Sequence, residues 1–103
     1  MYIAMNRFKV IKERAADFEA MWRNRDSYLH EVEGFKSFHL LKGPELGDHI
    51  VYSSHTMWES LAHFEGWTKS DAFKKAHAGA GKTADPVTIG PARFEGFEAV
   101  LSS

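Results

Sequence analysis

The residues best placed to do chemistry, Trp67 and His77, lie at the two ends of one short segment. Ser70 can accept hydrogen bonds from the amides of the following turn and Asp71 suits a positive helix N-terminus, so a helix is predicted to begin there, with Trp67 just outside it. Phe73 and His77 are four residues apart and share the apolar, inward-facing stripe of that helix. The His77 imidazole therefore needs a partner: a backbone carbonyl, a buried water, or a metal or haem iron to which it is an axial ligand.

A second candidate, Asn6, lies in the first predicted strand. Residues 2–10 alternate between two faces, which is typical of a strand. One of these faces carries Tyr2, Ala4, Asn6, Phe8 and Val10. Asn6 is the polar exception on what should be the core face, where an unsatisfied amide costs about 1–3 kcal/mol. Either the fold or a ligand must therefore satisfy it.

The middle of the chain predicts a long helix followed by a hairpin. An apolar stripe over residues 13–32 indicates a helix, and Gly34 supplies the left-handed residue that ends it. Residues 35–42 and 49–55 have strand character, and the turn residues between them, over 43–48, predict a hairpin.

The last third of the chain predicts two helical segments and one strand. Thr56 and Glu59 have the spacing of a reciprocal capping box, which indicates a helix running toward Trp67. Residues 79–91 predict a mobile loop. Residues 92–101 predict the last strand, and its apolar phase changes at Gly96, which a bulge would explain.

The resulting order, β-α-β-β-α(α)-β, predicts an α+β protein: a ferredoxin-like, split βαβ antiparallel sheet with the helices on one face. Apolar residues on the other face, such as Ile3 and Met5, are left without a cover. We therefore expect a homodimer packed through the sheets, as a dimeric α/β-barrel.

Composition narrows the classes of function. At 103 residues the chain is expected to form one domain over 1–103. A formal charge of −1 with dispersed Lys and Arg residues argues against nucleic-acid binding. Cysteine is absent, which excludes disulfides and thiolate metal sites and is compatible with a reducing compartment. Without a signal-peptide or transmembrane pattern, we expect a cytoplasmic protein with no membrane partner.

Three other features have competing interpretations. The run 76–83 is one residue away from a Walker phosphate loop but follows a helix rather than a strand, which argues against phosphate binding. Arg23 and Arg25 could meet carboxylates of a ligand, although a solvated face is favoured. The remaining histidines lack short metal-ligand spacing, and surface or hairpin positions are favoured over a zinc site, even though His39 could approach His49 or His55 across the hairpin. These histidines are His30, His39, His49, His55 and His63.

Taken together, Asn6, Trp67 and His77 match what haem requires, namely an axial imidazole, apolar walls and a distal polar group. In a ferredoxin-like fold the helices lie over the face that carries Asn6. A flat ligand between helix and sheet could therefore meet all three residues.

The chain also resembles the IsdG-type haem-degrading monooxygenases of the antibiotic-biosynthesis-monooxygenase superfamily, which are dimeric ferredoxin-like proteins. The resemblance spans Asn6 to His77 and is carried by Asn6-Arg7, Glu33-Gly34-Phe35 and Trp67-x-x-Ser70-Asp71-x-Phe73-Lys74-x-Ala76-His77. It implies that His77 is the proximal ligand of the haem iron, that Asn6 is the distal amide that hydrogen-bonds iron-bound dioxygen, and that Trp67 presses the macrocycle out of plane.

The resemblance further implies that haem is both cofactor and substrate, opened oxidatively to release its iron. Electrons must come from outside, for example from NAD(P)H with a reductase partner, because no flavin, nicotinamide or iron–sulfur motif is present. Two alternatives stay open: a non-catalytic haem-binding or trafficking module, and a cofactor-independent monooxygenase of an aromatic substrate.

Overall fold

The computed structural model describes residues 1–25, 29–77 and 87–103, apart from the side chains of Ala72, Ala76 and His77. The strands are β1 (Tyr2–Ile11), β2 (Phe35–Leu46), β3 (His49–Trp58) and β4 (Arg93–Glu98). The helices are α1 (Ala15–Arg23), α2 (Leu61–Thr68) and α3 (Asp71–His77), with short 3₁₀ turns η1 (Lys12–Arg14) and η2 (Leu29–Glu31).

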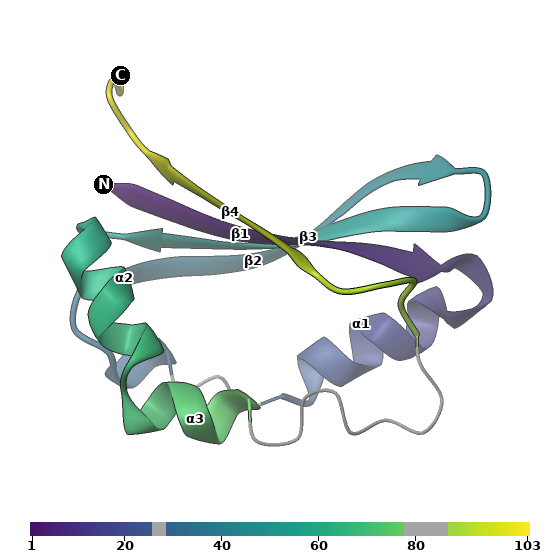
Figure 1. Ribbon diagram of the computed structural model, residues 1–103, viewed down its shortest axis with the longest axis horizontal. Coiled ribbons are helices and arrows are strands. Elements are labelled where there is room, and N and C mark those ends of the chain that lie inside the picture. The colour runs from purple at the N-terminus through teal and green to yellow at the C-terminus, as the bar shows by residue number, and fades with distance from the viewer. Residues whose placement is uncertain (26–28, 78–86) are drawn as a thin grey trace.

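The four strands form one antiparallel sheet in the order β2-β3-β1-β4. Figure 1 shows α1, α2 and α3 on the same side of this sheet. The predicted ferredoxin-like arrangement is therefore confirmed, with β1 in the middle between β3 and β4.

The alternation predicted for β1 is also confirmed. Ala4 and Val10 are buried beneath the helices, whereas Arg7 and Lys9 are exposed on the other face. Asn6 has the parity of the buried residues and lies opposite Ser54 on β3 and Phe94 on β4. The strand thus directs the Asn6 side chain into the layer between sheet and helices.

Two apolar clusters fill that layer, one under each helical region. The first joins the start of α1 to the sheet and contains Val10, Phe18, Tyr52 and Val87. The second contains Ala4, Leu29 and Trp58, with Phe64 and Trp67 of α2 packed against it. Because Asn6 lies between Ala4 and Val10 along β1, it lies where the two clusters meet.

The long helix predicted over residues 13–32 is wrong. α1 ends at Arg23, and η2 follows after residues 26–28, which lie outside the described part of the chain. Phe18 and Leu29 share a helical stripe in the sequence but are buried in different clusters. Burial of each residue against its own half of the sheet outweighs continuation of the helix. Gly34 has the predicted positive φ, 87°, and a Cβ there would clash with the His63 ring.

The capping box predicted at Thr56 is wrong as well, because β3 continues to Trp58. The Thr56 hydroxyl instead donates a hydrogen bond to the Ala4 carbonyl across the sheet, at 3.2 Å. Ser60 is the N-cap of α2, and its hydroxyl accepts a hydrogen bond from the His63 amide at 3.2 Å.

The bulge predicted at Gly96 is absent, since β4 pairs with β1 in unbroken register from Arg93 to Glu98. Gly96 lies against the Tyr2 hydroxyl, which occupies the space that a Cβ would need. The irregularities of the sheet lie in β2 instead, between Phe35 and Ser37 and between Lys42 and Glu45.

Residues 79–86 of the mobile loop predicted over 79–91 lie outside the described residues. From Val87 onward the chain is ordered against β1, because the Ile11 amide donates to the Val87 carbonyl at 2.9 Å and the Ile89 amide donates to the Lys9 carbonyl at 2.8 Å. The second half of this loop is therefore a paired segment rather than a mobile one.

The face of the sheet opposite the helices has no cover among the described residues (Figure 1). Leu41 and Phe97 lie on this face and are 42% and 50% exposed. Among the helices of the described segments, none combines the length and apolar character needed to cross a bilayer.

Candidate functional site

Asn6 and Trp67 line one cavity of about 60 Å³ between the sheet and the helices. Its polar lining comes from Arg25 and from the helix-facing side of the strands, and its apolar lining comes largely from aromatic side chains. The remaining lining residues are Ala4, Trp22, Arg25, Leu29, Phe38, Ser54, Thr56 and Phe64. The structure therefore brings together two of the three residues that sequence reasoning singled out.

The Asn6 amide has no hydrogen-bond partner among the described residues. One polar neighbour on the same face is already engaged elsewhere, because the Thr56 hydroxyl donates to the Ala4 carbonyl and accepts from the Trp58 indole. A half-buried amide with free donors and a free acceptor is set up to bind a ligand. Within the part of the chain that the structure describes, the fold supplies no partner for the Asn6 amide, and a ligand is the other alternative that the sequence raised.

Trp67 is held by aromatic neighbours on three sides. Its ring centroid lies 5.5 Å from that of Trp58, 6.3 Å from that of Phe64 and 4.8 Å from that of Phe73, the last in an edge-on contact of 83°. Contacts of this kind restrict the indole to few orientations. Trp67 is thus a firm, half-buried wall of the cavity.

Ser70 connects the Trp67 segment to α3, as predicted. Its hydroxyl donates to the Trp67 carbonyl at 2.6 Å and accepts from the Phe73 amide at 3.1 Å, which makes it the cap of α3. His77 is the last residue of α3, and its side chain lies outside the described residues. The Walker-like run continues from there into residues 78–83, which also lie outside them.

Sequence reasoning missed Trp22 and Phe38 as site residues. Their rings stack at 5.7 Å with an angle of 21°, and both line the cavity. Alternation counted from Phe35, which faces the helices, would have placed Phe38 on the opposite face of β2. The bulge after Phe35 shifts the register and brings Phe38 to the helix-facing side. Trp22 lies on the apolar helical stripe of α1, and a position on such a stripe is explained equally well by core packing as by a role in a site.

Arg23 and Arg25 lie in different surroundings. Arg25 is half-buried, lines the cavity, and lies with its guanidinium 4.7 Å from the centre of the Trp22 ring. Burial lowers the pKa of Arg25. Arg23 is exposed and forms an ion pair with Glu19 at 3.4 Å.

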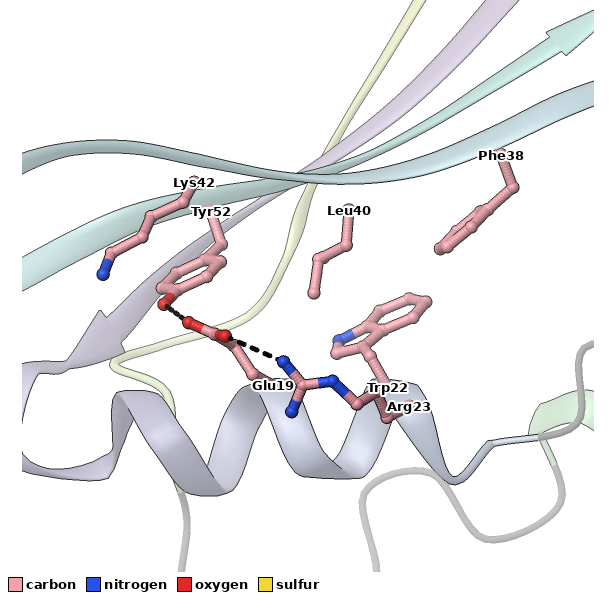
Figure 2. A pocket seen from close by; sticks show the side chains of 7 residues that line it. All are labelled: Glu19, Trp22, Arg23, Phe38, Leu40, Lys42 and Tyr52. Atoms are coloured by element: carbon pink, nitrogen blue, oxygen red, sulfur yellow. Dashed lines mark hydrogen bonds and ion pairs between the residues drawn. The ribbon is translucent and has the colours of Figure 1, made fainter.

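A larger groove of about 330 Å³ lies on the other side of Trp22 and Phe38, which line both spaces. Figure 2 shows Glu19 between the Tyr52 hydroxyl and Arg23, with Leu40 and the two aromatic rings forming the apolar part. The Tyr52 hydroxyl donates to Glu19 at 2.5 Å. This bond lowers the pKa of Glu19.

Tyr52 is expected to keep its proton far into the alkaline range. Burial, aided by the hydrogen bond to Glu19, raises the pKa of Tyr52 from 10.0 to about 12. Because the pKa of Tyr52 is higher in the folded chain, protonated Tyr52 contributes its full stabilisation of the fold below pH 10. This contribution is lost as the pH rises toward 12. The free energy of unfolding, measured with urea, should therefore fall across this range more steeply for wild type than for Tyr52→Phe. Equal slopes for the two proteins would contradict this assignment.

Comparison with known proteins identifies the family of this chain. The family described as antibiotic biosynthesis monooxygenase matches residues 1–79. The chain belongs to this family. A relative from Staphylococcus saprophyticus, described as heme oxygenase (staphylobilin-producing), is 36% identical over 83 residues, which cover 81% of this chain and 79% of the relative.

Two solved structures of family-like proteins are also similar. The heme-degrader MhuD from Mycobacterium tuberculosis, with two hemes bound in its active site, is 31% identical with a TM-score of 0.69, covering 100% of this chain and 99% of MhuD. SnoaB, a cofactor-independent oxygenase from Streptomyces nogalater, is 18% identical with a TM-score of 0.68, covering 98% of this chain and 94% of SnoaB. At 18% identity the SnoaB likeness supports the shared fold alone.

Proposed function

We propose that this antibiotic biosynthesis monooxygenase family member is a haem-degrading monooxygenase. Haem binds between the sheet and helices α2 and α3, its ring is opened oxidatively with dioxygen, and its iron is released. The observation that carries the proposal is the unpartnered Asn6 amide in an aromatic-lined cavity below Trp67. The haem oxygenase and the heme-degrader among the relatives support it.

Three residues have distinct tasks in this proposal. The His77 imidazole would hold the haem iron, and the Asn6 amide would donate a hydrogen bond where dioxygen reacts. Trp67 would be the rigid surface that presses on the macrocycle, because Trp58 and Phe73 hold its indole in place. Bound haem supplies the iron at which dioxygen is activated and the ring that is cut.

Haem is too large for the described cavity, so binding must widen it. Cofactor sites have volumes of roughly 300–1,000 Å³, whereas this cavity has about 60 Å³. Trp22 and Phe38 separate it from the groove of about 330 Å³. Displacement of the Trp22 ring would join the two spaces and give a flat ligand room beside the sheet.

We further propose that the reaction uses an external electron donor and that the protein is a homodimer. Electrons come from an external donor such as NAD(P)H with a reductase, since the sequence has no motif for a redox cofactor of its own. A homodimer packed through the sheets would cover the exposed apolar side chains of Leu41 and Phe97. The cytoplasmic location expected from the sequence stays a prediction.

A haem titration followed by absorbance tests the proposal. Wild type should develop a Soret band, and His77→Ala should bind haem at least about tenfold more weakly because the iron loses its axial imidazole. His49→Ala is the matched control, since His49 lies at the hairpin end beside Asp48 at 2.8 Å. Addition of ascorbate or a reductase in air should then bleach the wild-type band and release iron, measured with a ferrous-iron chelator.

Other outcomes would contradict the proposal in different ways. A stable band under reducing, aerobic conditions would indicate a haem carrier. The absence of any haem binding would indicate a cofactor-independent oxygenase acting on an aromatic substrate.

A further inference from the structure

A second polar side chain reaches the candidate cavity from the strand beside β1. Ser54 on β3 is the direct partner of Asn6 on β1, and both residues line the cavity of about 60 Å³. Direct partners on neighbouring strands carry their side chains on the same face, with Cβ atoms about 4.5–5.5 Å apart. The sheet therefore presents an amide and a hydroxyl side by side in the cavity that Trp67 also lines.

The Ser54 hydroxyl has no hydrogen-bond partner among the described residues, although the residue is only 6% exposed. The hydrogen bond between Ser53 and Ser54 does not involve this hydroxyl, because the Ser53 hydroxyl donates to the Ser54 carbonyl at 3.0 Å. Buried polar side chains are nearly always hydrogen-bonded, so an unpartnered hydroxyl at the wall of a cavity favours a ligand as its partner.

Thr56, the next residue of β3 on the same face, shows what a structural hydroxyl looks like in this cavity. Its hydroxyl donates to the Ala4 carbonyl at 3.2 Å and accepts from the Trp58 indole at 2.9 Å. Both its donor and its acceptor are therefore used within the fold. Ser54 carries the same chemical group two residues earlier, and within the described ranges the fold uses neither its donor nor its acceptor.

An amide beside a hydroxyl can donate two hydrogen bonds to one small acceptor. The Asn6 side chain has two N–H donors and the Ser54 hydroxyl has one O–H donor. Both donors stand on paired strands in the interior of the sheet, so their positions are fixed before a ligand arrives. Such preorganised donors act most strongly on an acceptor that carries or gains negative charge. The pair therefore suits a small, electron-rich ligand such as an oxygen species.

We propose that Ser54 is a second hydrogen-bond donor, beside Asn6, to dioxygen where it reacts with haem. This inference rests on the proposed function, because it requires haem in the cavity. Donors from two neighbouring strands hold a small ligand in two directions, whereas the amide alone holds it in one. Ser54 thus contributes to the orientation of the reacting oxygen as well as to the stabilisation of its charge.

Azide binding to the full chain loaded with ferric haem tests the proposal, because azide is a small anion that binds haem iron and accepts hydrogen bonds. Ser54→Thr and Ser54→Val have nearly the same shape and differ in one hydroxyl. Ser54→Val should bind azide about 10–100-fold more weakly than Ser54→Thr, as for loss of a hydrogen bond to a charged group. Ser53→Ala is the matched control, since Ser53 faces the other side of the sheet, and it should bind azide like wild type. Absorbance measures azide binding and, beforehand, the haem affinity of each variant.

Urea unfolding of the haem-free chain gives a second readout. Ser54→Ala should unfold at a urea concentration no lower than wild type, because no hydrogen bond within the fold is lost. A clearly lower midpoint would assign the hydroxyl to the fold and overturn the proposal. Equal azide affinity of Ser54→Thr and Ser54→Val would also overturn it, while normal haem binding by both would leave the proposed function standing. The absence of a Soret band in wild type would contradict the proposed function and this inference together.

Discussion

Asn6→Ala should bind haem nearly as well as wild type and degrade it about 10²–10³-fold more slowly, the loss typical of removing one hydrogen-bond donor from a reacting oxygen. Haem affinity should be kept because the Asn6 amide has no other partner among the described residues, so its removal leaves the fold intact. Haem affinity would be measured by Soret titration, and the rate by loss of that band in the presence of ascorbate and air.

Two further variants sharpen this test. Asn24→Ala removes the same side chain from the exposed C-cap of α1 and should keep the full rate. Asn6→Asp keeps the size but replaces the donor with a carboxylate, and it should be as slow as Asn6→Ala. If Asn6→Ala degraded haem at the wild-type rate, the distal role would be wrong and Asn6 would be only a strand residue.

Trp58→Ala should lower the free energy of unfolding by about 3–5 kcal/mol, the range for removing a buried Trp or Phe side chain. Trp58 is fully buried at the end of β3 and contacts Phe35, Phe64 and Trp67. Its indole also donates to the Thr56 hydroxyl at 2.9 Å. Urea unfolding followed by circular dichroism would measure the loss.

The control for this prediction is Val100→Ala, because Val100 is 93% exposed and its truncation should change stability by no more than about 0.5 kcal/mol. Trp58→Phe should lie between the two, since it keeps most of the ring volume but loses the hydrogen bond. A loss below about 1 kcal/mol for Trp58→Ala would mean that the second cluster repacks around the gap.

The parts of the fold that the sequence predicted well are those with long, one-sided patterns. β1 alternates over its whole length because one face packs on helices, and that regularity made Asn6 stand out as the polar exception. The Ser70 cap was equally readable, because a capping hydroxyl acts within a few residues of itself. Both signals are local or strictly periodic, so they can be recognised in a single sequence.

The errors arose where two local patterns competed and a distant contact decided between them. Thr56 and Ser60 are both possible N-caps, but the pairing of β3 with β1 keeps Thr56 in the sheet. The helical stripe that reaches Leu29 is real, yet Leu29 is buried with Trp58 rather than with Phe18. Such choices depend on residues far away in the sequence.

The candidate site was predicted in part for the same reason. Asn6 and Trp67 were found from strand parity and from a helix boundary, and the cavity unites them. The wall made by Trp22 and Phe38 was missed, because nothing in a single sequence says that an α1 residue will stack on a β2 residue. The role of His77 stays a prediction that the titration above will test.

The position of β1 between β3 and β4 also bears on the order of folding. The β2–β3 hairpin closes locally, with Leu46 opposite His49, whereas β1 pairs Tyr2 with Trp58 and with Glu98. Hairpins close within about 1–10 μs, and pairings between distant residues form more slowly because a long loop must be closed first. Asn6 therefore reaches its place beside Trp67 only after these long-range pairings form. The hairpin and α2 alone cannot complete the cavity that Asn6 and Trp67 line, so misfolding of β1 would remove this cavity even where the hairpin is native.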